Sequence, residues 1–282
     1  MQKESIWITG ASGKIGKAIM NRLKKQVDYR VVGTDLDVDI TDQDAVEQSM
    51  DVYRPNIVIN CASLSDAYYC EDHMIEAFRV NALGARNLAA ACRQHNAKLI
   101  HLSTDDVFCG DGSHGKTEFD VPTPRTVYGK SKLAGENFVK ELTPKHLIIR
   151  SSWVYGGKGD YISSILEKAE RGEEITAPLD QISSPTSTEE LAHFIEVMLD
   201  KKEYGIYHAS CEGACTRHEY ARTILHLAGY DPNLEHGTYN EKDGAIATTL
   251  LENLMLKMTG IYDMPPWREE LERYMGKYIK ND

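Results

Sequence analysis

The chain has 282 residues, of which 41% are hydrophobic and 27% are charged, as in a soluble globular protein with a buried core. Its formal net charge of −11 argues against nucleic acid as a partner, because nucleic acid favours basic surfaces. No apolar run approaches the roughly 20 residues of a membrane-spanning helix. The first residues enter a predicted strand and leave no room for a signal peptide. We therefore expect a cytoplasmic protein that binds neither nucleic acid nor a membrane.

The first 150 residues alternate predicted strands and helices. In chain order we expect a strand at 5–9, a helix at 14–25, a strand at 30–34, a helix at 42–53, a strand at 57–61, a helix at 71–94, a strand at 98–103, a helix at 127–142 and a strand at 146–150. Thr41 is the expected N-cap of the second helix. This alternation predicts parallel βαβ units, and hence an α/β fold with a doubly wound parallel sheet of the Rossmann type.

After residue 150 the pattern loosens. We expect a loop at 151–159, then helices at 161–172, 188–201, 216–229 and 268–278. This predicts an NAD(P)-binding domain over residues 1–150 and a smaller C-terminal substrate-binding lobe over 151–282. Part of 175–202 is expected to return to the first domain, so that the chain crosses between the lobes. The site should lie at the carboxyl ends of the parallel strands.

Six cysteines in a cytosolic chain of this size are expected to be reduced. Two of them lie in a cluster of candidate zinc ligands, His208, Cys211, Cys215 and His218. The spacing matches no common zinc pattern. A strand end, a loop and a helix capped by Thr216, with Glu219 as its capping-box partner, explain the same residues. We therefore expect no metal here.

A glycine-rich turn, Gly10-x-x-Gly13-x-x-Gly16, follows the first predicted strand and opens the first predicted helix. Glycines permit a tight turn and let backbone N–H groups approach a pyrophosphate, beside the positive end of a helix dipole. An ordinary strand–helix turn is the alternative, but the strand before the turn and the helix after it favour a dinucleotide site. The cofactor residues predicted here are Gly10, Ser12, Gly13, Lys14, Ile15 and Gly16.

Asp35 ends the second predicted strand. A carboxylate at this point accepts hydrogen bonds from the adenine-ribose hydroxyls and repels a 2′-phosphate, which favours NADH over NADPH. Lys14 is a nearby cation, so NADPH stays open as the cofactor. After the third strand, Cys61, Ala62 and Ser63 are expected to pass under the cofactor, although Cys61 alone is equally well explained as a small core residue.

Tyr128 and Lys132 lie four residues apart on a predicted helix, and therefore on one face. Reduction of a carbonyl needs a proton donor, and a free tyrosine with a pKa of about 10 is a poor one near neutral pH. A neighbouring ammonium stabilises the phenolate and lowers that pKa. Thr104 is placed to orient the carbonyl, and Asn81 to support Lys132 through water. Each residue alone has an ordinary explanation, as a packed tyrosine, a solvated lysine or a turn threonine.

Three features in this order, the glycine turn, Ser103-Thr104 after an apolar run and Tyr128-x-x-x-Lys132, resemble the extended short-chain dehydrogenase/reductase superfamily. The resemblance implies an enzyme that moves a hydride between a nicotinamide and a carbonyl or alcohol. It implies that Lys132 holds the nicotinamide ribose. It also adds four residues to the predicted cofactor site, Asp39, Ile40, Asn81 and Ser103.

Longer motifs run through nearly the whole chain. They are DITD at 39–42, RPNIVIN at 54–60, VNALG at 80–84, STD at 103–105, YGKSKLAGE at 128–136, WVYG at 153–156, SPT at 184–186 and PWR at 266–268. As a set they resemble the dTDP-4-dehydrorhamnose reductase family. The resemblance implies reduction of the C4 ketone of a dTDP-6-deoxy sugar by NADPH or NADH, to give dTDP-L-rhamnose. Thr104, Tyr128 and Lys132 would be its catalytic trio. The implied substrate-binding residues are Ser65, Thr104, Asp105, Asp106 and Trp153.

The departures from the family concern the substrate loops. Asp106 stands where the family usually has tyrosine, Cys109 replaces a usual aspartate, and the loop at 64–71 lacks most of the usual pattern. Asp243-Gly244-Ala245 stands where the family has basic side chains near the diphosphate, and an acidic residue there should repel a pyrophosphate. We therefore expect intact redox machinery beside an altered sugar-nucleotide site.

Some relatives bind magnesium at a dimer contact through clustered glutamates. Glu190 matches one of them, but Ile15 occupies another expected carboxylate position, so no such metal site is predicted. A homodimer stays open. Two alternatives also stay open: the same chemistry on another keto sugar or carbonyl compound, or a non-catalytic NAD(P)-binding regulatory subunit like the β subunit of methionine adenosyltransferase.

Overall fold

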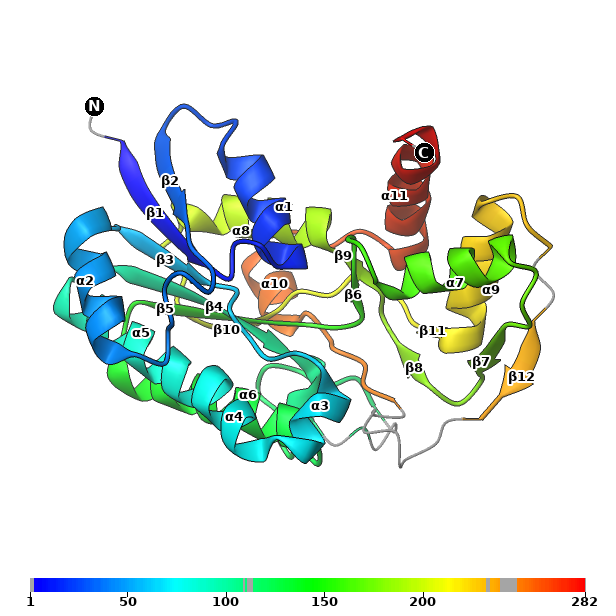
Figure 1. The fold of residues 1–282 in the computed structure, drawn as a ribbon, viewed down its shortest axis with the longest axis horizontal. Helices are drawn as coiled ribbons and strands as arrows, with labels where there is room; N and C mark the ends of the chain where they lie inside the picture. Colours follow the sequence, from blue (N-terminus) through cyan, green and yellow to red (C-terminus); the bar gives the residue numbers. More distant parts are fainter. Residues whose placement is uncertain (1–2, 109, 111–113, 232–233, 239–247, 282) are drawn as a thin grey trace.

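The computed structural model of the chain describes residues 3–108, 110, 114–231, 234–238 and 248–281 (Figure 1). Its centre is a six-stranded sheet made of β1 (Glu4–Thr9), β2 (Tyr29–Gly33), β3 (Ile57–Asn60), β4 (Lys98–Thr104), β5 (His146–Ser151) and β10 (Gly205–His208). The strands lie in the order β10-β5-β4-β3-β1-β2, and every neighbouring pair is parallel. The predicted α/β class and the doubly wound parallel sheet are confirmed.

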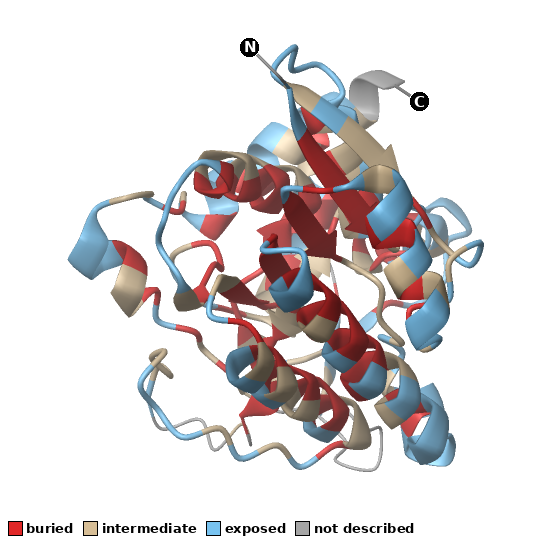
Figure 2. Cartoon of the chain, turned by 90° about the vertical axis from the view of Figure 1, so that its left-hand side faces the viewer, coloured by how far each residue is buried: buried red, intermediate tan, exposed pale blue. Residues whose placement is uncertain are grey.

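Helices cover both faces of this sheet (Figures 1 and 2). They are α1 (Lys14–Leu23) and α8 (Thr188–Leu199) on one face, and α2 (Gln43–Tyr53), α5 (Ala85–Gln94) and α6 (Val127–Leu142) on the other. Ile6 and Ile8 pack in the core beneath α1 and α8, whereas Trp7 between them packs in the core on the opposite face. Because both faces are buried, the strands read as continuous apolar runs.

The helical stretch predicted over 71–94 is irregular in its first part. The stretch is divided into α3 (Ala67–Asp72), α4 (Met74–Phe78), a π-helical turn (Arg79–Gly84) and α5. Asp66 starts α3 by accepting a hydrogen bond from Tyr69 N at 3.0 Å, and His73 leaves the helical region with φ −126° and ψ 50°. The N-cap of α2 also differs from the prediction, because Asp42 rather than Thr41 accepts the hydrogen bond from Asp44 N, at 2.9 Å.

The C-terminal lobe is built from short strands and three helices. Its elements are β6 (Val154–Tyr155), α7 (Tyr161–Glu170), β7 (Thr176–Pro178), β8 (Ile182–Ser183), β9 (Thr186–Ser187), β11 (Cys215–Thr216), α9 (Arg217–Leu227), β12 (Glu235–Gly237) and α11 (Trp267–Asn281). β6 pairs with β9, so the predicted loop at 151–159 contains a short strand. Sequence analysis also missed α10 (Leu254–Thr259), which packs against β10.

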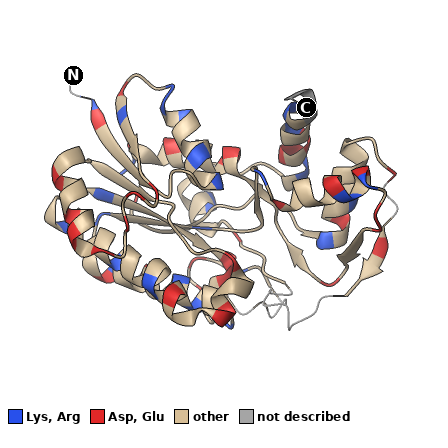
Figure 3. Cartoon of the chain, in the orientation of Figure 1, with Lys and Arg blue, Asp and Glu red and all other residues tan. Residues whose placement is uncertain are grey.

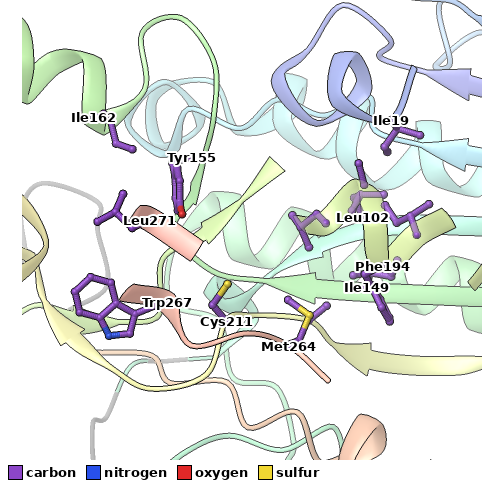
Figure 4. Close-up of a cluster of buried hydrophobic side chains, with 14 of the residues drawn as sticks. Ile19, Leu102, Ile149, Tyr155, Ile162, Phe194, Cys211, Met264, Trp267 and Leu271 are labelled. Carbon is purple, nitrogen blue, oxygen red and sulfur yellow. The ribbon is translucent and has the colours of Figure 1, made fainter. Parts of the chain in front are cut away.

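The chain returns from the lobe to the sheet before it enters the lobe again. α8 packs against α1, and β10 extends the sheet beyond β5. Buried Lys98 fixes this return, because its ammonium donates hydrogen bonds to Met198 O at 2.6 Å and to Lys201 O at 2.7 Å, at the end of α8. Figure 4 shows sheet residues such as Ile149 in one hydrophobic cluster with Trp267 of α11. The sheet and the lobe therefore share a core.

Acidic and basic residues are interspersed over both parts of the molecule (Figure 3). Within the described residues, no helix combines the length and the apolar character needed to cross a membrane.

Candidate active site

The glycine-rich turn lies where the strand order reverses, between β1 and β3. Gly10 has a φ of +64°, and a Cβ on it would stand 2.5 Å from Ala62 N, so only glycine fits. A Cβ on Gly16 would stand 2.2 Å from Gly10 O. Because glycine lacks this atom, α1 can begin directly against the turn. The N–H of Ser12 donates to the Asp35 carboxylate at 2.8 Å. The turn therefore presents backbone groups at the switch point, where open α/β sheets bind ligands.

A cavity of about 630 Å³ opens beside this turn, within the usual range for ligand sites. Nine residues predicted for the cofactor line it: Gly10, Ser12, Gly13, Asp35, Asp39, Ile40, Cys61, Ala62 and Ser63. The buried hydroxyl of Ser63 has no hydrogen-bond partner among the described residues, as expected of a group that bonds a ligand. Gly13 caps α1 without a side-chain hydrogen bond, which leaves the N-terminal N–H groups for an anion. These features fit a dinucleotide.

Other residues line the same cavity without having been identified from the sequence, namely Leu36, Val38, Thr41, Leu64, Glu76, Arg79 and Val80. The last three come from α4 and the π-helical turn. A continuous helix over 71–94 gave no reason to place them at the cofactor. The break in the helix brings these residues to the site. No local motif in the sequence marks them.

Two residues predicted for the cofactor point elsewhere. Lys14 lines a separate groove of about 950 Å³ beside α8, and its side chain packs on Gly157, where a Cβ would lie 3.0 Å from Lys14 Cγ. Ile15 packs against the hydrophobic core. Their contact with a cofactor stays a prediction.

Thr104, Tyr128 and Lys132 meet at the carboxyl end of β4. Thr104 is the last residue of that strand, and its hydroxyl lies near enough to the phenol of Tyr128 to lower the pKa of that phenol. Lys132 reaches the same strand, because its ammonium donates to Leu102 O at 2.6 Å. Thr126 caps α6 by accepting a hydrogen bond from Gly129 N at 2.9 Å, which places Tyr128 in the first helical turn.

The pKa of Tyr128 shifts in the direction opposite to the prediction. Burial raises it, and the carboxylates of Asp106 and then Asp105 raise it further. The ammonium of Lys132 does not offset these effects, because it is bonded to a backbone carbonyl and burial lowers its own pKa to about 8. The phenol is therefore held in its protonated form, which is the form that donates a proton to a ketone oxygen.

Asn81 bonds the loop after β3, and its support of Lys132 through water stays a prediction. Its amide accepts a hydrogen bond from Leu64 N at 2.8 Å and donates to Leu64 O and to Ser131 Oγ, both at 2.9 Å. These bonds join the loop after β3 to α6. Because Leu64 lines the cofactor cavity, Asn81 positions a wall of that cavity.

Ser103 belongs to a buried charged network beside the site. Its hydroxyl donates to Glu136 at 2.6 Å, and Arg150 forms two hydrogen bonds with the same carboxylate, at 2.9 and 2.7 Å. Both charged side chains are almost fully buried. Arg150 also lies over the ring of Phe108, with its Cζ 5.2 Å from the ring centre. Sequence analysis did not identify this ion pair, because its partners come from separate elements.

The predicted substrate residues are mostly contiguous. Asp105 accepts hydrogen bonds from Ser152 Oγ at 2.7 Å and from Thr104 Oγ1 at 3.2 Å, which joins the end of β4 to the segment that carries Trp153. Ser65, in contrast, is exposed in the loop after β3. Cys109 and the 243–245 segment lie outside the described residues.

The family described as "RmlD substrate binding domain" matches residues 4–279. The chain belongs to the RmlD family. It is 35% identical over 275 residues to the spore coat polysaccharide biosynthesis protein SpsK of Bacillus subtilis, with 96% of each chain covered.

Two solved structures agree with this assignment. A dTDP-4-dehydrorhamnose reductase of Clostridium acetobutylicum has a TM-score of 0.94 at 36% identity, with 97% of this chain and 99% of the other covered. The dTDP-4-dehydrorhamnose reductase of Bacillus anthracis, in complex with NADP, has a TM-score of 0.94 at 35% identity, with 98% and 99% covered. The family resemblance predicted from the sequence is confirmed.

In this RmlD-family chain, Glu190 of α8 is bonded by side chains from the C-terminal part of the chain. The carboxylate accepts hydrogen bonds from the hydroxyl of Tyr262 and from Arg273, the latter at 2.8 Å. The guanidinium of Arg273 thus supplies the positive charge beside the Glu190 carboxylate.

The candidate zinc residues are dispersed. Cys211 and Cys215 lie in the hydrophobic core, and His218 stacks on His236 with ring centres 5.0 Å apart.

Asp106 gives this RmlD-family chain a testable dependence of stability on pH. Burial, followed by the charge of Asp105, raises the pKa of Asp106 from 3.8 to about 8. The folded state therefore binds more protons than the unfolded state between these values, and folding stability falls as the pH rises through that window. We expect Asp106→Asn to remove this loss. The variant should melt at a higher temperature than the wild type near pH 8, with the difference vanishing near pH 4.

Thermal unfolding of both proteins across that range measures the effect. Asp44→Asn, an exposed position in the first turn of α2, is the matched control and should leave the difference between the two pH values unchanged. A constant difference between Asp106→Asn and wild type at all pH values would contradict the prediction.

Proposed function

We propose that this chain is an NAD(P)H-dependent reductase of a 4-keto-6-deoxy sugar nucleotide, with dTDP-4-keto-L-rhamnose as its substrate. The Thr104 hydroxyl beside the protonated phenol of Tyr128, at the end of the strand next to the cofactor cavity, carries the proposal. The named activity of the Clostridium and Bacillus anthracis proteins supports the choice of substrate.

The residues of the site divide the reaction between them. A bound nicotinamide supplies the hydride. The hydroxyls of Thr104 and Tyr128 orient the ketone oxygen, and Tyr128 gives up its proton as negative charge develops there. Lys132 would hold the nicotinamide ribose while its bond to Leu102 O fixes its position. Asp35, at the end of β2, would receive the adenine-ribose hydroxyls, and the N–H groups around Gly13 the pyrophosphate.

Preference for NADH over NADPH is part of the proposal and rests on Asp35. Its carboxylate lines the cavity and is fixed by Ser12 N, so a 2′-phosphate would meet a negative charge. We expect Asp35→Ser to raise the ratio of kcat/KM for NADPH to that for NADH by about tenfold or more, or about 1.4 kcal/mol. Steady-state kinetics with both cofactors measures this ratio.

The control for this measurement is Asp44→Ser, which removes an exposed carboxylate from α2, outside the cavity. It should leave the cofactor ratio unchanged. If the Asp35 variant also keeps the wild-type ratio, Asp35 does not select the cofactor.

Oxidation of NADH and of NADPH by the full chain, followed by absorbance with freshly generated dTDP-4-keto-L-rhamnose, tests the proposed function. Rapid oxidation that requires the keto sugar supports it. Oxidation with a different keto sugar or carbonyl compound alone would keep the chemistry and change the substrate. Binding of both cofactors without turnover of any of these compounds would favour a regulatory subunit instead.

A further inference from the structure

Arg217, the first residue of α9, has its guanidinium in contact with two aromatic rings. Its Cζ lies 3.5 Å from the ring centre of Trp153 and 4.6 Å from that of Tyr161. Gln181 holds the base of the side chain, accepting hydrogen bonds from Arg217 N at 2.8 Å and from Nε at 3.3 Å. Because Nε is bonded to Gln181, the terminal N–H groups of the guanidinium are left for other partners.

This arginine differs from the other arginines that are withdrawn from solvent. Over the described part of the chain, three arginines are not exposed, namely Arg22, Arg150 and Arg217. Arg22 is paired with Glu196, and Arg150 with Glu136. Arg217 has no carboxylate within ion-pair distance among the described residues, and its terminal nitrogens bond none of their acceptors. Burial lowers its pKa, but a guanidinium stays charged in proteins.

A cation that is partly removed from water without an opposite charge is costly for folding, and such a group is therefore a candidate for binding a ligand. Its ring contacts also fix the orientation of the fork-shaped guanidinium. A fixed fork with two free terminal nitrogens is suited to an oxyanion that accepts two parallel hydrogen bonds, such as a phosphate.

The position of Arg217 connects it to the proposed reaction. Trp153, on which it stacks, directly follows Ser152, and Ser152 donates to Asp105 next to Thr104. The end of the site near Tyr128 carries the carboxyl groups of Asp105 and Asp106. The charge of Asp105 also acts on Arg217, so the guanidinium lies close to this end of the site, where it offers a substrate diphosphate a positive charge.

We infer that Arg217 binds the diphosphate of the sugar-nucleotide substrate, with Trp153 and Tyr161 holding its guanidinium in place. This inference rests on the proposed function, because the diphosphate carries the full negative charges of such a substrate. The sequence lacks the family's basic side chains in the 243–245 segment. Arg217 of α9 would supply a cation for the diphosphate in their place.

Binding of dTDP and of thymidine to the full chain, measured by titration calorimetry, tests the inference without requiring turnover. We expect Arg217→Gln to weaken dTDP binding by about tenfold or more and to leave thymidine binding unchanged. Arg217→Lys should restore only part of the affinity, because lysine lacks the bidentate fork. The dependence of dTDP affinity on salt should be less steep in Arg217→Gln than in the wild type.

Arg222→Gln is the matched control, since it removes an exposed arginine from the same helix. It should bind dTDP like the wild type. Melting temperatures separate a binding role from a structural one: Arg217→Gln should be about as stable as the wild type without ligand, because it removes a half-buried cation that has no carboxylate partner.

Equal dTDP affinity of the wild type and Arg217→Gln would overturn the inference and leave the proposed reductase intact. Weaker binding of a dTDP-sugar with unchanged binding of dTDP would also overturn it, and would place the guanidinium at the sugar. If the wild type does not bind dTDP, the inference fails as well, and the turnover assay described above decides separately whether the chain is a reductase of another carbonyl substrate.

Discussion

Replacing Tyr128 by phenylalanine is expected to lower kcat by about 10²- to 10⁴-fold, the usual contribution of a positioned general acid. The phenol is half-buried, protonated and close to the hydroxyl of Thr104, so its removal deletes the proton donor and leaves the hydrophobic ring. The cap of α6 and the bond from Lys132 to Leu102 O do not involve the phenol. Binding of NADH or NADPH should therefore stay within about twofold of wild type.

Single-turnover kinetics and cofactor titration measure these two effects separately. Tyr53→Phe removes a hydroxyl from α2, outside the cofactor cavity, and is the control that should keep full activity. If Tyr128→Phe retains kcat close to wild type, another group protonates the ketone. Asp106 would then be the first group to examine, because burial and Asp105 keep its pKa near 8.

Replacing Glu136 by glutamine is expected to lower the free energy of unfolding by about 3–5 kcal/mol, because it leaves the buried guanidinium of Arg150 without its counter-charge. For a chain of 282 residues this corresponds to a fall in melting temperature of about 5–8 °C. Denaturant or thermal unfolding measures the loss. Ser103 near the end of β4 donates to the same carboxylate, so we expect the loss of the Glu136 charge to disturb this end of the strand as well.

The matched control is Glu167→Gln, which breaks the exposed pair with Arg171, at 3.2 Å on the surface of α7. Its effect should stay within about 0.5 kcal/mol. Replacing both members of the buried pair, by Glu136→Leu together with Arg150→Met, should recover part of the lost stability, since apolar side chains can replace a buried ion pair. A stability loss in the double variant as large as the sum of the single losses would argue against this account of the pair.

The sequence predicted the sheet well, because buried parallel strands and amphipathic helices leave periodic signals within each segment. The helix that carries Tyr128 and Lys132 begins and ends where predicted, since Thr126 supplies a local cap. The break at His73 and the π-helical turn that holds Asn81 could not be predicted, because they depend on contacts with Leu64 and Ser131 from other elements.

The candidate site was predictable where a motif and a strand end coincide, as at Gly10 and Asp35, both of which line the cavity. The pKa of Tyr128 was not predictable from the Tyr-x-x-x-Lys spacing. It depends on burial and on Asp106, and neither can be read from the spacing. Arg217 was missed for a similar reason, because its aromatic neighbours Trp153 and Tyr161 are distant in the sequence.

The return of the chain through α8 and β10 limits how substrate specificity could be transplanted between relatives. The lobe consists of two stretches of sequence, one before α8 and one after β10, while the stretch between them belongs to the layers around the sheet. A graft that exchanged everything after residue 150 would also replace the partner of Lys98 and the outermost strand. An exchange of the lobe alone needs cut points on both sides of the stretch from α8 to β10. Both parts of the lobe then have to be exchanged together.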